Sequence, residues 1–200
     1  MRIVLIHGFK ASSKSNFFPW LKEALVNLGH EVIAPDLPDA DAPDQDEWTK
    51  ALLEEVKVVD DETIIVGHSI GATTALRFLE AVEAKSTPKG CLLISPPWMI
   101  KDERFRGFFM SELDFDVLMW KASRFTIIHS KDDKVIPFDH AQKYAEVLAA
   151  KLVERNEGEE HFQGEQYPVI LDEINKLIAE EIVYAPGKSL DDQFQELHER

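Results

Sequence analysis

Short apolar runs alternate along the chain with longer stretches in which apolar residues return every three or four positions. The short runs, several of them rich in β-branched residues, predict six strands at residues 2–6, 31–34, 63–66, 90–95, 124–129 and 151–155. The longer stretches predict helices at residues 19–28, 47–58, from the end of the third strand to 84, 138–150 and 168–183. Strands that alternate with helices indicate an α/β fold, in which a mostly parallel sheet is covered on both faces.

The length of 200 residues fits one domain with a sizeable buried core. Because no internal repeat or low-complexity segment interrupts the pattern, we expect a single domain over residues 1–183. Residues 184–200 extend past the last predicted helix as a flexible tail, a capping helix or an added segment. Residues 98–123 form an insert between the fourth and fifth predicted strands.

The chain is acidic, with a formal net charge of −15. Nucleic acids and anionic membrane surfaces bind cationic faces, so this charge argues against both as partners. No signal peptide or membrane span is expected, because the first apolar run, residues 3–6, is far too short. The single cysteine, Cys91, excludes an internal disulfide and suits a reducing compartment, and its apolar surroundings predict a buried thiol. We therefore expect a cytoplasmic protein.

A G-x-S-x-G motif lies between the third predicted strand and the helix that follows, in the segment Thr-Ile-Ile-Val-Gly-His-Ser-Ile-Gly-Ala at residues 63–72. In this context the motif is typical of a nucleophile elbow, a sharp turn on which the Ser69 hydroxyl stands clear of the backbone. Gly67 and Gly71 lack a Cβ, so the strand and the helix can pass close to each other. The first N–H groups of the helix then face a developing oxyanion. The alternative is a glycine-flanked turn that only packs a helix on a strand.

A nucleophilic serine needs a base, and the base needs a carboxylate that orients it. Both are expected at the carboxyl ends of the parallel strands, where functional residues collect in such sheets. Asp133 follows the fifth strand in a tight loop that ends at Pro137, and His161 follows the sixth strand. Asp132 is the alternative carboxylate, and we favour Asp133. The order Ser69, Asp133, His161 is the chain order of an α/β-hydrolase triad, so these three are the predicted catalytic residues.

No metal or other cofactor is predicted, because no group of residues has metal-ligand spacing. The other histidines are therefore expected to be structural or exposed. His7 ends the first strand and is expected to anchor a loop, and His68 is expected to point away from the nucleophile. His129 remains open between a structural role and contact with the site. The histidines expected on the surface are His30, His140 and His198.

Five segments stand out as a set: Leu5-Ile-His-Gly-Phe-Lys-Ala-Ser-Ser13, Phe18-Pro-Trp-Leu21, Gly67-His-Ser-Ile-Gly71, Ser130-Lys-Asp-Asp-Lys-Val-Ile-Pro-Phe138 and His161-Phe162. Together they resemble the small YdeN-type serine hydrolases, relatives of the retinoblastoma-binding serine hydrolase in the α/β-hydrolase superfamily. The resemblance covers about residues 1–182. It implies a compact α/β-hydrolase fold with six parallel strands in the order 2-1-3-4-5-6, and a triad of Ser69, Asp133 and His161. The family usually has glycine before the histidine, where this chain has Glu160.

These features predict a serine hydrolase that cleaves small carboxylic esters, with amides as a further substrate class. His161 would take the Ser69 proton, and the backbone N–H groups of Phe9 and Ile70 would hold the oxyanion on the way to an acyl-enzyme. Acidic residues around His161 favour neutral or cationic substrates over anionic ones. The alternative is a catalytically weak protein that uses the same fold as a protein-binding module.

The insert at residues 98–123 is rich in aromatic residues and methionine. At the strand ends such a segment is typical of a lid or of the wall of an acyl pocket. The alternative, which we weigh equally, is that it packs into the core. The residues expected to line the substrate pocket are Trp98, Phe108, Phe109 and Met110.

Overall fold

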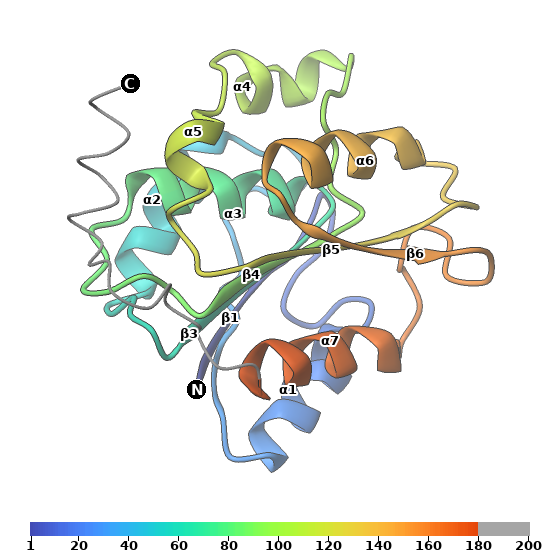
Figure 1. Cartoon of the computed structure of the whole chain (residues 1–200). Coiled ribbons are helices and arrows are strands. Elements are labelled where there is room, and N and C mark those ends of the chain that lie inside the picture. Colours follow the sequence, from blue (N-terminus) through green and yellow to red (C-terminus); the bar gives the residue numbers. More distant parts are fainter. Residues whose placement is uncertain (180–200) are drawn as a thin grey trace.

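In the computed structural model, which describes residues 1–179, six strands form one sheet (Figure 1). The spatial order β2-β1-β3-β4-β5-β6 confirms the predicted fold class and strand order. Each adjacent pair of strands is parallel. The strands are β1 (Arg2–Ile6), β2 (Glu31–Ile33), β3 (Thr63–His68), β4 (Gly90–Ile94), β5 (Phe125–Ser130) and β6 (Lys151–Arg155).

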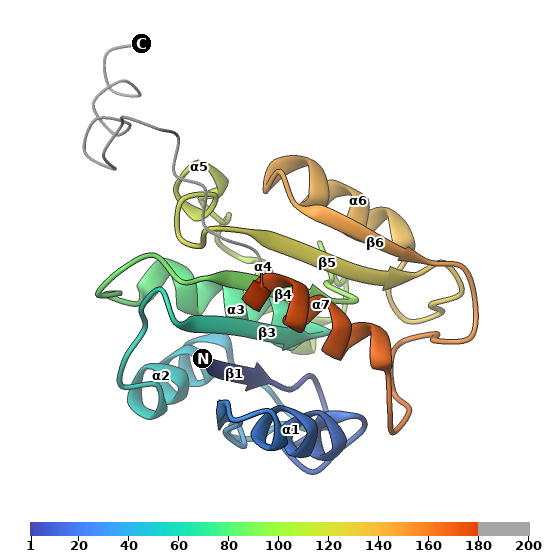
Figure 2. The same ribbon diagram turned by 60° about the horizontal axis from the view of Figure 1, so that its bottom comes forward.

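Helices cover both faces of the sheet, as Figures 1 and 2 show. One face carries α1 (Phe18–Asn27) and α7 (Pro168–Ala179), and the other carries α2 (Gln45–Glu55), α3 (Ile70–Ala81) and α6 (Phe138–Val147). The insert between β4 and β5 contains a 3-10 turn, η1 (Glu103–Phe105), and two short helices, α4 (Arg106–Phe109) and α5 (Phe115–Leu118). Both short helices pack near α3, on the second of these faces.

Side chains of the central strands alternate between two buried cores. In β3, Ile65 joins the core that contains Trp48 on the α2 side of the sheet. Its neighbours Ile64 and Val66 join the core that contains Phe17 on the α1 side. Because successive side chains of a strand point to opposite faces and both faces are covered, this strand is apolar throughout rather than alternating.

The helix ends differ from the predicted ones by a few residues. α2 begins earlier than predicted because Asp44 caps it, accepting a hydrogen bond from the Glu47 N–H at 3.0 Å. α3 ends before residue 84 because Val82 already has an extended backbone. The end of the last predicted helix, at residues 180–183, and the predicted extension, at residues 184–200, lie outside the described residues.

Two further expectations concern the interior and membranes. Cys91 is fully buried in β4, as predicted, and burial raises the pKa of its thiol. Within residues 1–179, none of the helices combines the length and the apolar character that a membrane crossing requires.

Candidate active site

Ser69 occupies a sharp turn between β3 and α3. Its backbone has φ 55° and ψ −130°, a conformation that residues other than glycine rarely adopt. A Cβ added to Gly67 would lie 2.5 Å from the Gly71 carbonyl oxygen, and one added to Gly71 would lie 2.3 Å from the His7 carbonyl oxygen. No such atom fits at these distances, so the turn requires glycine on both sides of the serine, as the motif predicts.

The three predicted catalytic residues lie within hydrogen-bonding distance of one another. Ser69 Oγ is 3.0 Å from His161 Nε2, and His161 Nδ1 is 2.8 Å from Asp133 Oδ2. The histidine side chain is 6% exposed and the carboxylate is fully buried. When Nδ1 carries the ring proton and donates a hydrogen bond to Asp133, Nε2 is free to accept a hydrogen bond from the Ser69 hydroxyl. The geometry is that of a nucleophile, a base and an orienting carboxylate.

The environment of Asp133 keeps its carboxylate ionised. Oδ1 accepts hydrogen bonds from the N–H groups of Val135 at 2.8 Å and Ile136 at 2.9 Å. Oδ2 is also 3.3 Å from Nε2 of His129. Burial alone would raise the pKa of Asp133, but hydrogen bonds from His129 and His161 outweigh it and hold the pKa well below its usual range. The carboxylate can therefore stabilise an imidazolium on His161.

Asp132, the alternative carboxylate, serves the loop rather than the imidazole. It accepts hydrogen bonds from the Gly158 N–H at 2.7 Å and the Glu160 N–H at 3.1 Å. These bonds attach the loop before His161 to the loop after β5. Glu160 has φ 45°, in the left-handed region that glycine adopts without strain. The glycine that is usual at this position in the YdeN-type hydrolases would fit this conformation.

His129 contacts the site, one of the two roles that the sequence left open. Its Nε2 donates to the Ile136 carbonyl at 2.9 Å as well as approaching Asp133. The side chain is fully buried at the end of β5. His129 and His161 therefore both contact Oδ2 of Asp133.

His68 supports the proposed base through its backbone. Its Nε2 donates to the carbonyl oxygen of His161 at 2.8 Å, and its ring packs edge-on against Phe17. Burial lowers the pKa of His68 from 6.5 to about 3, and the neighbouring His161 contributes to the shift. A neutral, buried ring thus connects the elbow to the loop that carries His161.

We expect this buried ring to make the fold sensitive to acid. Between pH 3 and 6.5 the unfolded chain takes up a proton at this histidine that the folded chain does not, so the free energy of unfolding falls as the pH falls through that window. Between pH 7.5 and 4.5, wild type should lose about 2–3 kcal/mol more than His68→Gln, which keeps a donor for the His161 carbonyl. Urea unfolding at both pH values measures this difference. His30→Gln, at a partly exposed histidine outside the site, is the control, and an equal effect in both variants would contradict the assignment.

The two residues predicted to supply oxyanion N–H groups lie beside the nucleophile. Phe9 and Ile70 line the same cavity as Ser69. The Ile70 N–H belongs to the first turn of α3, where N–H groups have no partner within the helix. His7 anchors the Phe9 loop, as predicted: its Nε2 accepts from the Leu37 N–H at 2.9 Å, and its Nδ1 donates to the Gly8 carbonyl at 2.9 Å.

The cavity at Ser69 has a volume of about 520 Å³ and lies at the carboxyl ends of the strands. His161 and the predicted oxyanion residues line one part of it. The remaining lining includes five residues of the insert at 98–123, for which a pocket wall was one of the expected roles, and one residue of α6. They are Met99, Ile100, Lys101, Arg104, Phe105 and His140, the last of which was expected on the surface.

The predicted pocket residues do not line this cavity. Trp98, Phe108 and Phe109 line a neighbouring cavity of about 410 Å³, and Met110 is 71% exposed and lines neither. Phe108 is instead buried in the core, where its ring packs edge-on against Trp48 at 5.6 Å between centroids. The prediction of these pocket residues was wrong because the apolar pattern of the insert indicates that a side chain is buried but not which cavity or core it faces.

The carboxylates near His161 are held by other groups. Glu159 accepts from Arg155 at 2.7 Å, and Glu160 lies 3.6 Å from Lys134. Neither these glutamates nor Asp132 line the Ser69 cavity. The sequence-based reason for favouring neutral or cationic substrates therefore has no counterpart in the lining of the site.

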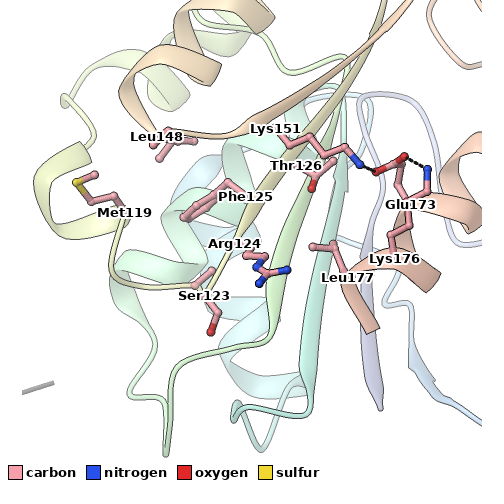
Figure 3. Close-up of a pocket in the computed structure, with 12 residues that line it drawn as sticks. Met119, Ser123, Arg124, Phe125, Thr126, Leu148, Lys151, Glu173, Lys176 and Leu177 are labelled. Carbon is pink, nitrogen blue, oxygen red and sulfur yellow. Dashed lines mark hydrogen bonds and ion pairs between the residues drawn. The ribbon is translucent and has the colours of Figure 1, made fainter. Parts of the chain in front are cut away.

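A separate cavity of about 280 Å³ lies at the amino ends of β5 and β6. Figure 3 shows its charged side chains, among which Glu173 lies between Lys151 and Lys176, accepting from each ammonium group at 2.7 Å. No histidine lines this cavity, so its serine and threonine hydroxyls lack the histidine partner that Ser69 has. Among residues 1–179, no set of three His, Cys, Asp or Glu side chains is placed to hold a metal ion.

Comparisons with known proteins agree with the fold and the motif. The chain is 28% identical to YdeN of Bacillus subtilis (strain 168) over 189 residues, which cover 90% of this chain and 97% of YdeN. The crystal structure of the ydeN gene product superimposes with a TM-score of 0.81 at 26% identity, covering 90% of this chain and 99% of that one. Serine hydrolase RBBP9 of Rattus norvegicus is 24% identical over 166 residues, covering 81% of this chain and 86% of the relative.

The sequence model of one family matches most of the chain. It spans residues 3–175, from β1 into α7, and its description is serine hydrolase. With the α/β-hydrolase fold and the strained Ser69 turn already established, the match covers each element that carries a residue of the site. The chain therefore belongs to the serine hydrolase family.

Proposed function

We propose that this serine hydrolase cleaves small carboxylic esters through an acyl-enzyme, with Ser69 as nucleophile, His161 as base and Asp133 as the orienting carboxylate. The observation that carries the proposal is the unbroken hydrogen-bond chain from Ser69 Oγ through the His161 ring to Asp133. Its nucleophilic end opens into a cavity of about 520 Å³, a size typical of small-molecule sites.

The reaction would proceed in two halves. His161 Nε2 takes the Ser69 proton as Oγ attacks the ester carbonyl, and the backbone N–H groups of Phe9 and Ile70 stabilise the tetrahedral oxyanion. His161 then gives its proton to the leaving alcohol, and the acyl group stays on Ser69. In the second half the same base activates water, which releases the acid and restores the serine.

The lining of the cavity supports an ester with a modest apolar part. Ile100, Phe105 and Ile136 supply an apolar wall. Amides remain a further substrate class, because the acyl-enzyme is common to both reactions.

Labelling by a fluorophosphonate probe tests the proposal. Intact mass should show one adduct on native wild-type protein, because the base and the oxyanion donors activate Ser69 towards phosphorylation. The adduct should be absent from Ser69→Ala and from heat-denatured wild type. No adduct on well-folded wild type would contradict the proposal and favour the use of the fold as a protein-binding module.

A further inference from the structure

The cavity at Ser69 differs in charge from the protein as a whole. The chain carries 37 acidic and 22 basic residues, yet Lys101 and Arg104 line the cavity and no aspartate or glutamate does. Both cations come from the insert between β4 and β5, at and just before η1. An acidic protein thus presents cationic side chains at its proposed catalytic site.

Lys101 is available to a ligand. Its side chain is exposed, and its ammonium group has no hydrogen-bond or ion-pair partner among residues 1–179. An ammonium group carries three donors and a full charge, so a bound anion would replace water as its partner.

Arg104 is held in place by its neighbours and still has one nitrogen that can donate to a ligand. Its Nε and Nη2 atoms pair with the Asp102 carboxylate, the shortest contact being 2.6 Å, and Nη1 has no partner among the described residues. The guanidinium group lies over the rings of Phe9 and Phe105, at 5.1 and 5.6 Å from their centroids. These stacking contacts hold the group beside the loop that carries a proposed oxyanion N–H.

We propose that the substrate is an ester that also carries a carboxylate. Lys101 and Nη1 of Arg104 bind this carboxylate while Ser69 attacks the ester carbonyl. This inference rests on the proposed function and reverses the substrate charge expected from the sequence. Hydrolysis breaks the bond between the acyl carbon and the ester oxygen. The oxygen of water joins the acyl carbon, one proton of that water ends on the leaving alcohol and the other on the released acid, and the substrate's own carboxylate is unchanged.

Matched ester pairs test the inference on both sides of the scissile bond. On the acyl side, the mono-4-nitrophenyl ester of adipic acid is compared with the analogue in which a carbamoyl group replaces the free carboxylate. On the alcohol side, 3-(4-acetoxyphenyl)propanoate is compared with its amide. Each pair differs in charge and hardly in size, so the ratio of kcat/KM within a pair isolates recognition of the carboxylate.

For wild type we expect the carboxylate to be preferred about tenfold in at least one pair, the effect of one charge-assisted hydrogen bond. The ratio should fall towards one in Lys101→Met and Arg104→Met, and below one in Lys101→Glu. It should also shrink as salt screens the charges. Lys22→Glu makes the same change of charge on α1, across the sheet, and should keep the wild-type ratio.

The outcomes separate this inference from the function on which it rests. Hydrolysis of both members of each pair with ratios at or below one would overturn the inference and leave the proposed function standing. Ratios that fall equally in Lys22→Glu and Lys101→Glu would also overturn it, because overall charge rather than the cavity would be responsible. Absence of hydrolysis in every pair, together with absence of fluorophosphonate labelling, would overturn both.

Discussion

Replacing Ser69 by alanine is expected to lower kcat for ester hydrolysis by at least about 10⁴-fold. The change removes the only hydroxyl within hydrogen-bonding distance of His161 Nε2 among the described residues, and with it the acyl-enzyme route. The oxyanion donors and the cavity remain, so a small residual rate above that in water is expected. Steady-state hydrolysis of a 4-nitrophenyl ester measures the loss, and KM should change much less than kcat.

Ser95→Ala is the matched control for this loss. Ser95 lies at the carboxyl end of the neighbouring strand, is fully buried, and its hydroxyl has no hydrogen-bond partner among the described residues. Its removal should leave kcat within a few-fold of wild type. If Ser69→Ala retained a rate similar to that of Ser95→Ala, Ser69 could not be the nucleophile.

Replacing Asp133 by asparagine is expected to lower kcat by about 10⁴-fold, because the amide cannot hold His161 in the tautomer that accepts the serine proton. The variant keeps one oxygen for the N–H groups of Val135 and Ile136 but loses the charge that stabilises the imidazolium. Its kcat is measured alongside urea unfolding, so that a loss of folding is not taken for a loss of chemistry.

Asp132→Asn separates the two neighbouring carboxylates. Asp132 attaches the loop before His161 through the Gly158 and Glu160 N–H groups, so Asp132→Asn should lower the free energy of unfolding. Its loss of kcat should be at least about 100 times smaller than the loss in Asp133→Asn. Equal losses in the two variants would show that loop position, rather than the charge beside His161, limits the reaction.

The sheet and the relative positions of Ser69, Asp133 and His161 could be predicted because their signals are local. The central strands β3 and β4 are buried, mostly apolar runs covered on both faces, and the elbow demands glycine at two positions that no other residue fits. Parallel strands then bring residues that follow different strands to one edge of the sheet. Their catalytic roles remain predictions until the variants are measured.

The lining of the cavity could not be predicted in the same way. Lys101 and Arg104 reach it because of how the insert folds over α3, His140 reaches it from α6, and none of them lies in a motif. The net charge of −15 describes the whole surface and says nothing of one cavity. His129 shows the same limit: its contact with Asp133 depends on a side-chain direction at the end of β5 that no pattern encodes.

The order of the strands also determines when reactivity can arise during synthesis. Ser69 leaves the ribosome 92 residues before the histidine that we propose as its base, and that histidine follows β6, which pairs only with β5 at one edge of the sheet. A nascent chain therefore carries an inert serine, because the hydroxyl is a weak nucleophile until its base arrives. With the proposed triad, hydrolytic activity would therefore begin only when β6 and the loop after it have joined the sheet.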